Sequence, residues 1–269
     1  MSVITISRGS FSGGKMLAEC LAQRLRYRCI DRDVIVERAA ACGVSQEELR
    51  DALEKPPGFL DRFSHRKYLY LALIQAALAE EIRTGRAIYH GLAGHLLLKG
   101  RPQILRTRII APLEFRIRMA QDRLKFNRAE AVAYIQKMDQ QRRKWTQFLY
   151  GVDWGDPSLY DIVINLDHID IEQACRVIAG LARERCFEFT PDCQAAMDDL
   201  ALASRVRANL ALDPATAHLE FEVDAFRGKV TIEGRLGNLD EIGEVRRVAS
   251  VSPGVAELDL DALAPNIHA

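Results

Sequence analysis

Short apolar runs alternate with longer segments over the first two thirds of the chain. Five runs predict buried strands: Val3–Ile6, Tyr27–Ile30, Ala87–Tyr89, Ile104–Ile110 and Ile162–Leu166. Segments with helical periodicity lie between them, and strands that alternate with helices form a parallel sheet that the helices cover. The pattern therefore predicts an α/β fold class for residues 1–190.

Some of the intervening segments carry specific helix signals. Gln46–Leu53 follows a capping box in outline, and Lys67–Thr84 is apolar on nearly every face in its first half. The second of these is expected to be a core helix. Phe115–Phe126 and Arg128–Phe148 predict a long, heavily charged pair of helices.

The pattern changes after about residue 190. A helix, two strands, a second helix and a last strand are predicted, in that order, at Gln194–Leu212, Ala217–Asp224, Gly228–Gly234, Leu239–Ser250 and Val255–Leu260. An α–β–β–α–β order of this length is typical of a separate small α+β domain, over residues 195–265. Thr190-Pro191-Asp192 is the expected linker.

The balance of charged residues bears on whether the chain binds nucleic acid. The 269 residues include 37 basic and 37 acidic side chains, so the formal net charge is zero. A neutral chain has no long-range field that gathers nucleic acid, although a local basic pocket remains compatible with it. We expect no nucleic-acid partner.

The six cysteines and the apolar runs bear on the compartment. Cys20, Cys29, Cys42, Cys175, Cys186 and Cys193 include no C-x-x-C pair, and the N-terminus shows no signal segment. The longest apolar stretch stops at Glu80-Glu81, short of a membrane span. We expect a soluble, cytoplasmic protein with reduced thiols and no zinc site.

The most specific motif follows the first predicted strand. Gly9-Ser-Phe-Ser-Gly-Gly-Lys15 has the spacing G-x-x-x-x-G-K of a phosphate-binding loop (P-loop), in which backbone amides and a lysine hold a nucleoside triphosphate. The residues predicted to bind it are Gly9, Ser10, Ser12, Gly13, Gly14, Lys15 and Met16. The alternatives are a glycine-rich turn that only connects two elements, and a solvated Lys15.

Residues 1 to about 185 resemble the nucleoside monophosphate kinases, and among them the cytidylate-kinase-like family. The resemblance is carried by Ile4–Arg8 with Ser12–Gly14, by Tyr27–Asp33, by Glu54–Pro57, and by Val152–Asp156 with Tyr160, Asp161 and Asn165. Residues 196–262 resemble a BON domain, through Val206–Leu210, Phe226–Gly234 and Pro253–Val255.

The first resemblance implies ATP-dependent phosphoryl transfer, with Mg²⁺, to a nucleoside monophosphate or a similar small phosphate acceptor. It implies catalytic roles for Lys15, for Asp31 beside the bound monophosphate, and for Arg142 on a lid formed by the charged helices. It also implies acceptor contacts from Asp31, Asp33, Arg38, Gly91 and Arg143. Two alternatives stay open: one of the aspartates caps a helix, and the arginines lie on a solvated face.

Two positions depart from the family pattern. Met16 stands where most such loops place a Mg²⁺-binding hydroxyl, a role that Ser10, Ser12 or water can take over. Leu92 stands where the family has an arginine, and His90 or His95 can replace it only in part. The alternative function is a catalytically weak or inactive nucleotide sensor. It would be coupled to the BON-like domain, whose resemblance implies phospholipid, another small ligand or a protein as partner.

Overall fold

The structure is a computed structural model that describes residues 2–54, 64–91, 93–98, 100 and 103–265. Contacts divide the chain into two compact units, each described by itself below. Unit 1 comprises Met1–Val34, Leu53–Pro57 and Gly85–Phe189, and unit 2 comprises Ile35–Ala52, Gly58–Thr84 and Thr190–Ala269. Both this division and the predicted two continuous domains place a boundary near residue 190, but unit 2 also takes two segments from the first half of the chain.

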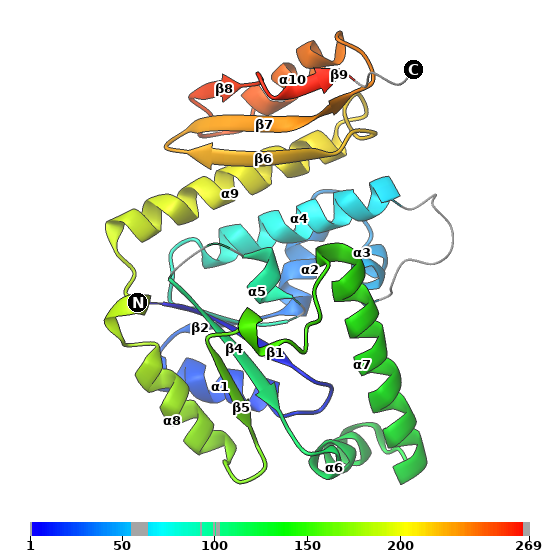
Figure 1. Ribbon diagram of the computed structural model, residues 1–269, viewed down its shortest axis with the longest axis vertical. Coiled ribbons are helices and arrows are strands. Elements are labelled where there is room, and N and C mark those ends of the chain that lie inside the picture. The colour runs from blue at the N-terminus through cyan, green and yellow to red at the C-terminus, as the bar shows by residue number, and fades with distance from the viewer. Residues whose placement is uncertain (1, 55–63, 92, 99, 101–102, 266–269) are drawn as a thin grey trace. The chain divides into compact units, whose positions relative to one another are not determined.

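A five-stranded parallel sheet forms the centre of unit 1 (Figure 1). Its strands are β1 (Val3–Arg8), β2 (Arg28–Asp31), β3 (Ala87–His90), β4 (Ile104–Ile110) and β5 (Ile162–Asn165), in the order β2-β3-β1-β4-β5. Val3 pairs with Ala87 on one side and with Ile104 on the other. The predicted α/β class and the five predicted strands are confirmed. Because β1 is the central strand, the loop that follows it lies where ligands bind in open α/β sheets.

Helices α1 (Gly14–Leu25) and α8 (Ile171–Leu181) pack together against the sheet. Their shared core includes Ile4, Ile6, Leu17, Leu21, Ile88, Leu105, Ile109, Ile164, Cys175 and Ile178. A capping box formed by Asp170 and Gln173 begins α8 and satisfies backbone groups at its first turn. The remaining short elements of unit 1 are α5 (Gly94–Leu97) and the 3₁₀ turns at Pro157–Leu159 and Arg185–Phe187. Helix α2 (Arg32–Ala40) begins in unit 1.

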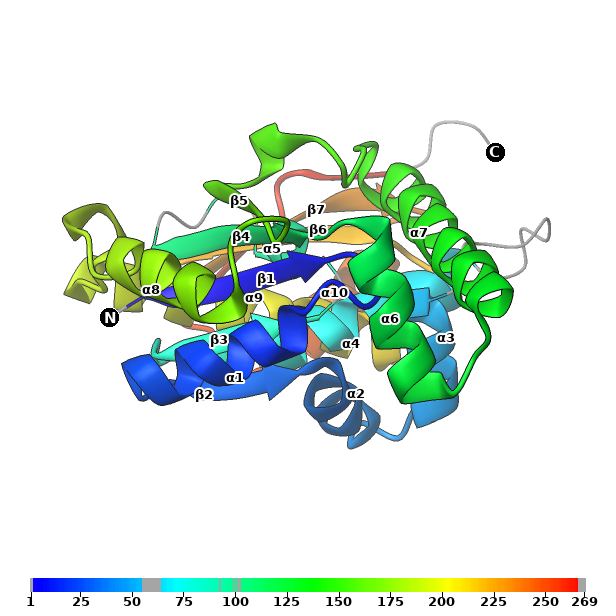
Figure 2. The same cartoon turned by 90° about the horizontal axis from the view of Figure 1, so that it is seen from below.

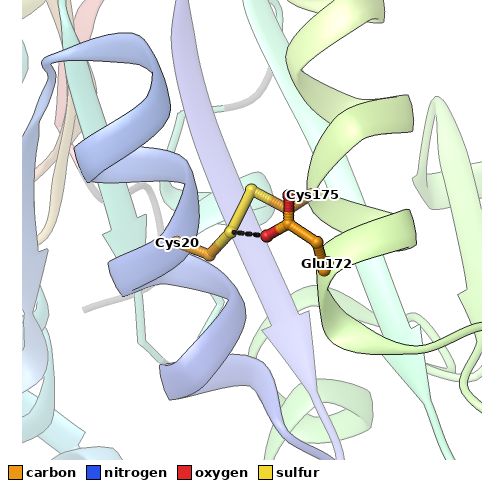
Figure 3. A group of neighbouring side chains, drawn as sticks. All are labelled: Cys20, Glu172 and Cys175. Atoms are coloured by element: carbon orange, nitrogen blue, oxygen red, sulfur yellow. Dashed lines mark hydrogen bonds between the residues drawn. A yellow bond between two sulfur atoms is a disulfide. The ribbon is translucent and has the colours of Figure 1, made fainter.

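Cys20 and Cys175 form a disulfide between α1 and α8 (Figure 3). The prediction of six reduced thiols is therefore wrong for this pair. The reason is that 155 residues separate the two cysteines along the chain. Only the packing of α1 on α8 brings them together, and no local spacing records that packing.

The predicted charged helices are α6 (Leu113–Leu124) and α7 (Arg128–Tyr150), which pack against each other (Figure 2). Ile117 and Ala120 meet Ala131 and Ile135 in a small core of their own. Helix α7 begins at a complete capping box: the Asn127 side chain accepts from the Glu130 amide, and the Glu130 carboxylate accepts from the Asn127 amide.

Unit 2 contains a small mixed sheet with helices. Its elements are α3 (Gln46–Glu54), α4 (Ser64–Ile82), α9 (Pro191–Leu212), β6 (Phe221–Phe226), β7 (Lys229–Leu236), α10 (Glu241–Ser250), β8 (Glu257–Asp259) and β9 (Leu263–Pro265). Strand β7 pairs antiparallel with β6 and parallel with β8 and β9. The hairpin turn at Arg227 and Gly228 has φ of 50° and 83°, so both residues are left-handed, as in a type I′ turn. The predicted α–β–β–α–β order is confirmed, and β9 extends it.

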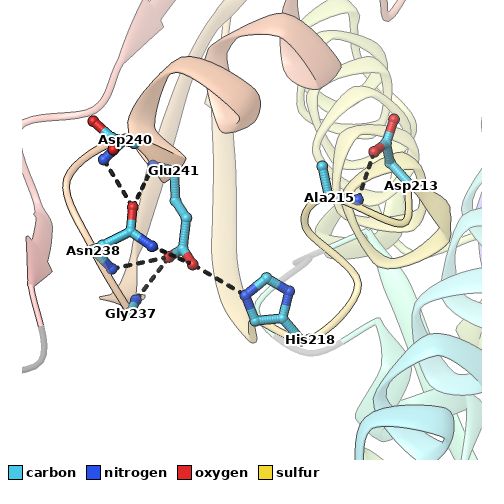
Figure 4. Close-up of polar contacts among 7 residues, drawn as sticks. All are labelled: Asp213, Ala215, His218, Gly237, Asn238, Asp240 and Glu241. Atoms are coloured by element: carbon cyan, nitrogen blue, oxygen red, sulfur yellow. Dashed lines mark hydrogen bonds and ion pairs between the residues drawn. The ribbon is translucent and has the colours of Figure 1, made fainter. Parts of the chain in front are cut away.

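Side-chain caps fix the loops of this sheet (Figure 4). The Glu241 carboxylate accepts from the backbone amide of Gly237 at 2.7 Å and lies 3.1 Å from the imidazole of His218. Asp213 accepts from the Ala215 amide at 3.0 Å just after α9 ends. The contact between Glu241 and His218 holds the start of α10 to the loop before β6.

Helix α4 packs along α9 within unit 2. As predicted for a core helix, its buried residues include Ala72, Leu73, Ile74, Leu78 and Ala79. The buried Tyr68 hydroxyl donates to the Phe221 carbonyl at 2.7 Å and accepts from the Phe221 amide at 3.0 Å. Tyr68 thus joins α4 to the first residue of β6. None of the described helices is long and apolar enough to cross a membrane.

We expect Tyr68→Phe to lower the free energy of unfolding by about 1–3 kcal/mol, because it leaves the amide and carbonyl of Phe221 buried without their partner. The ring, and its contact with the Arg207 guanidinium 4.7 Å away, is retained. Chemical denaturation with a tryptophan-independent signal such as far-ultraviolet circular dichroism measures the change. Wild-type stability in Tyr68→Phe would contradict a joining role for this hydroxyl.

Candidate phosphate-binding site

The loop between β1 and α1 has two residues in the left-handed backbone region. Phe11 and Gly13 have φ of 61° and 82°, and the buried Ser12 hydroxyl donates to the Gly9 carbonyl at 3.0 Å. The amides of the first turn of a helix have no partner within the helix, so the start of α1 offers donors to an anion.

At two positions of the loop, neighbouring side chains come so close that only glycine fits. A Cβ on Gly13 would lie 2.9 Å from Cδ1 of Ile171 and 3.2 Å from Cδ1 of Leu166, in a left-handed backbone conformation. A Cβ on Gly14 would collide with the side chain of Arg8. The Gly-Gly pair therefore lets α8 and Arg8 pack directly on the loop.

A cavity of about 300 Å³ opens beside this loop. It is lined by Arg8, Ser10, Phe11, Lys15, Asp31, Arg32, Asp33, His90, Gly91, Arg123, Tyr134, Met138 and Arg142. Among these described residues, five side chains are cationic and two are carboxylates. Positive charge is thus concentrated here in a chain whose net charge is zero. We call this space the P-loop cavity.

Several polar atoms around the P-loop cavity are buried and have no hydrogen-bond partner within the described part of the chain. They are Ser10 Oγ, Arg8 Nε, His90 Nδ1 and Arg142 Nε. A buried polar group without a partner costs about 1–3 kcal/mol. Their clustering in one cavity matches a guest that accepts several hydrogen bonds, and phosphate oxygens do so.

The electrostatics of the cavity agree with an anionic guest. Burial, and then the charge of Arg8, lower the pKa of Arg142 to about 10, so its guanidinium stays charged at neutral pH. Burial, and then Arg32 and Arg123, lower the pKa of Arg8. Burial and the charge of Arg8 also lower the pKa of His90, which keeps its imidazole neutral at pH 7. The repulsion between these cations would be relieved by a bound phosphate.

Arg142 reaches the P-loop cavity from α7, and its Nη1 donates to the Arg8 carbonyl at 2.9 Å. A second arginine, Arg116 on α6, donates to the Ser10 carbonyl at 2.8 Å and to Asp139 on α7 at 2.7 Å. The charged helices are therefore joined to the phosphate loop by guanidinium groups. Nothing in the local sequence marks Arg116 for this role.

The aspartates at the end of β2 lie at the same cavity. Asp31 lines it and also caps α2, because its Oδ1 accepts from the Val34 amide at 3.0 Å. Asp33 and Gly91 line the cavity as well. The capping alternative thus holds for Asp31 without removing its carboxylate from the cavity.

A second cavity of about 150 Å³ lies beside the loop. It is lined by Gly9, Ser12, Arg108, Ile110, Ala111, Arg116, Asp139, Arg143, Trp154 and Gly155. The Arg108 guanidinium lies 4.2 Å from the centre of the Trp154 ring, which is only 7% exposed. Trp154 is thus a packing anchor at the edge of this cavity. Arg143 belongs to this second cavity and lies 3.8 Å from Asp153.

The remaining predicted residues differ in whether they line a cavity. Arg38 forms an ion pair with the buried carboxylate of Glu81 in unit 2 and is not among the residues that line either cavity. Lys15 lines the P-loop cavity with its side chain half exposed, 3.9 Å from Glu19. Met16 is 40% exposed. Leu92 and residues 55–57 of the Glu54–Pro57 match lie outside the described residues.

His95 behaves as a core side chain. Its ring packs against Tyr160 at a centroid distance of 4.7 Å, and burial, followed by the charges of Arg108 and Arg106, lowers its pKa to about 3. Of the two histidines that sequence reasoning offered as partial replacements for an arginine, only His90 lines the cavity.

A phosphate loop after the central strand of a parallel sheet, beside a cationic cavity, defines a P-loop protein of the nucleotide-kinase class. The comparisons agree with this class and support nucleotide-dependent phosphoryl transfer in general. A family model described as the cytidylate kinase-like family matches residues 3–168, more than half of the chain. The chain belongs to this family.

Curated relatives include a cytidylate kinase of Thermococcus kodakarensis, 29% identical over 167 residues that cover 62% of this chain and 80% of the relative. A cytidylate kinase of Pyrococcus horikoshii is 27% identical over 164 residues, or 61% of this chain and 79% of the relative. Among solved structures, an uncharacterized protein of Eubacterium ventriosum matches with a TM-score of 0.52 and 19% identity. That match covers 69% of this chain and 100% of the other, and it shows a shared fold.

The P-loop cavity makes a prediction about anions. Inorganic pyrophosphate at about 100 times its Kd should raise the free energy of unfolding of the wild type by about 2.7 kcal/mol. We expect Arg8→Met to lose at least half of this gain at the same concentration, because a charge-assisted hydrogen bond is gone. Without the anion, Arg8→Met should be at least as stable as the wild type, since a half-buried cation that Arg32 and Arg123 repel has been removed.

The matched control is Arg118→Met, which removes an exposed cation that does not line the cavity. It should keep the full gain from pyrophosphate. Thermal and urea denaturation with and without the anion measure both effects. A full gain in Arg8→Met would show that the cavity is not the anion site.

Proposed function

We propose that this protein transfers the γ-phosphoryl group of ATP to a nucleoside monophosphate, of cytidylate type, or to a similar small phosphate acceptor. The observation that carries the proposal is the set of unpartnered buried donors and cations in the P-loop cavity. Phosphoryl transfer depends on positioning and charge neutralisation, and these groups supply both. The names of the archaeal relatives support cytidylate as the acceptor.

The two cavities beside the loop support separate places for donor and acceptor. Asp31, His90 and Gly91 lie at the ends of β2 and β3, in the P-loop cavity. We assign this part to the acceptor. The smaller cavity, which shares the loop through Gly9 and Ser12, is then left for the nucleoside part of ATP. Lys15 and the loop amides would hold the phosphates that connect the two.

Arg142 would neutralise charge on the transferring group. It comes from α7, reaches the end of β1 and lines the cavity that holds Lys15 and Asp31. Its pKa of about 10 leaves it fully protonated at neutral pH. A half-buried guanidinium that is charged at neutral pH stabilises the charge that spreads over the phosphoryl oxygens during transfer.

The residues present also fit Mg²⁺ held largely through water. Met16 offers no oxygen, but the buried Ser10 hydroxyl has no partner among the described residues, and the Asp31 and Asp33 carboxylates line the same cavity. Magnesium keeps several waters in kinase sites and needs few protein ligands. When bound, it would neutralise phosphate charge.

Lys15→Ala tests this function. We expect turnover, measured as ADP release in a coupled assay over a panel of nucleoside monophosphates, to fall roughly 100-fold or more. The cause would be loss of the cation that bridges the phosphates. Lys137→Ala removes an exposed lysine of α7 outside both cavities and should leave turnover unchanged. If Mg-ATP binds by calorimetry but no acceptor in the panel is phosphorylated, transfer to a nucleotide is refuted.

The alternative is a nucleotide sensor with weak or no transfer. It is favoured by Met16, which is exposed at the position that follows Lys15. If Met16 and Leu92 are the reason that transfer is weak, Met16→Thr combined with Leu92→Arg should raise turnover. Robust turnover in the unaltered chain would exclude the sensor.

For the C-terminal part we propose a regulatory or assembly role. The family model ends at residue 168, so the resemblance of residues 196–262 to a BON domain stays a prediction. The α–β–β–α–β order of the small mixed sheet agrees with that resemblance in topology alone.

A further inference from the structure

Cys20 and Cys175 lie on α1 and α8, the two helices whose first turns adjoin the phosphate-binding loop. Cys20 is on α1, five residues after Lys15, and Cys175 is on α8. Their Cα atoms are 6.3 Å apart, within the range that disulfides span, and their sulfurs are bonded (Figure 3). Neither residue has a part in the proposed phosphoryl transfer.

The two sulfurs differ in access. Cys20 is partly exposed, whereas Cys175 is completely buried in the core of unit 1. A reagent from solution can therefore reach Cys20 alone. Cys175 can react only with a sulfur that is already held next to it, which is the position of a resolving cysteine.

Charged groups lie next to the partly exposed sulfur of Cys20. Oε2 of Glu172 lies 3.3 Å from Cys20 Sγ, a distance at which the reduced thiol would donate to it. The same carboxylate forms ion pairs with Arg24 and with Arg176. The sulfur that solution can reach therefore lies in a polar, charged setting, whereas Cys175 lies in the apolar core.

The remaining cysteines indicate that the pair is not a permanent structural disulfide. Cys29, Cys42, Cys186 and Cys193 are thiols in the structure, and the first three are exposed. Exposed thiols are typical of proteins in reducing surroundings, where disulfides are usually transient. The chain thus combines one bonded pair with four thiols, and in reducing surroundings the bond of that pair would be opened and closed.

We propose that Cys20 and Cys175 form a reversible oxidation site for low-molecular-weight disulfides such as oxidised glutathione. The Cys20 thiolate attacks one sulfur of the reagent, a mixed disulfide forms, and one small thiol leaves with a proton. The Cys175 thiolate then attacks Cys20 Sγ and displaces the second small thiol. Two protein thiols are oxidised, and one small disulfide is reduced to two thiols.

Closing this bond ties α1 to α8, and both helices contact the phosphate loop. Lys15 lies in the first turn of α1, while Ile171 in the first turn of α8 packs against Gly13. Oxidation would therefore hold α1, and with it the phosphate loop, against α8. The chemistry of the cysteine pair does not rest on the proposed kinase activity, so either can fail without the other.

The full chain is equilibrated in mixtures of reduced and oxidised glutathione, quenched with acid, unfolded, and labelled with an alkylating reagent. Intact mass should show six labels in the reduced state and four in the oxidised state, since the chain has six cysteines. Peptide mapping should find Cys20 joined to Cys175. Return to six labels in excess dithiothreitol, without denaturant, is the expected sign of reversibility.

Single variants separate the two roles. Cys175→Ser should trap a glutathione adduct on Cys20, whereas Cys20→Ser should give no adduct on the buried Cys175. Cys186→Ser, which removes an exposed thiol outside the pair, should still lose two labels on oxidation. The oxidised wild type should melt roughly 5 °C or more above the reduced form, a difference that Cys20→Ser abolishes.

Three outcomes would overturn the proposal. The first is six labels in the wild type at every glutathione ratio, and the second is a disulfide that maps to other cysteines. The third is a Cys20–Cys175 bond that dithiothreitol cannot open in the folded protein, because the pair would then be a fixed staple.

Discussion

The crowding of positive charge at the end of the central strand is the constraint on which the rest of unit 1 depends. Arg8 and Arg142 both line the P-loop cavity. Burial lowers the pKa of both, and neighbouring cations lower it further: Arg32 and Arg123 for Arg8, and Arg8 for Arg142. Such a cluster is unfavourable unless its surroundings hold it in place or an anion occupies it. The apolar core that α1 and α8 form with the sheet, and the glycine contacts of the loop, supply the rigid support.

Helices α6 and α7 share in this constraint. Arg116 ties α6 to the loop through the Ser10 carbonyl and to α7 through Asp139, while Arg142 ties α7 to β1. Each guanidinium donates to a backbone carbonyl, and each side chain also lines a cavity. Arginine suits this double use because its planar group donates in several directions at once. The same side chains can thus position the helices and meet a phosphate.

Local spacing is what could be predicted from the sequence. The strands, the phosphate loop and the charged helices follow from runs, glycines and periodicity within short windows. Arg116 could not be found that way, because its partner Ser10 lies 106 residues earlier. The Cys20–Cys175 bond was missed for the same reason. Arg38 shows the same limit from the other side: it lies close to Asp31 along the chain, but its ion-pair partner, Glu81, is distant in sequence.

The C-terminal part of the chain packs with a helix from its first half. Unit 2 takes α4, which lies between β2 and β3 in the sequence, and packs it along α9. Tyr68 of α4 bonds both backbone groups of Phe221, and Ala72 meets Ala211 in a buried cluster. Removing residues 190–269 would expose this face of α4 and leave the Tyr68 hydroxyl without its partners. The chain segment that joins β2 to β3 of the parallel sheet therefore contributes α4 to the packing of unit 2.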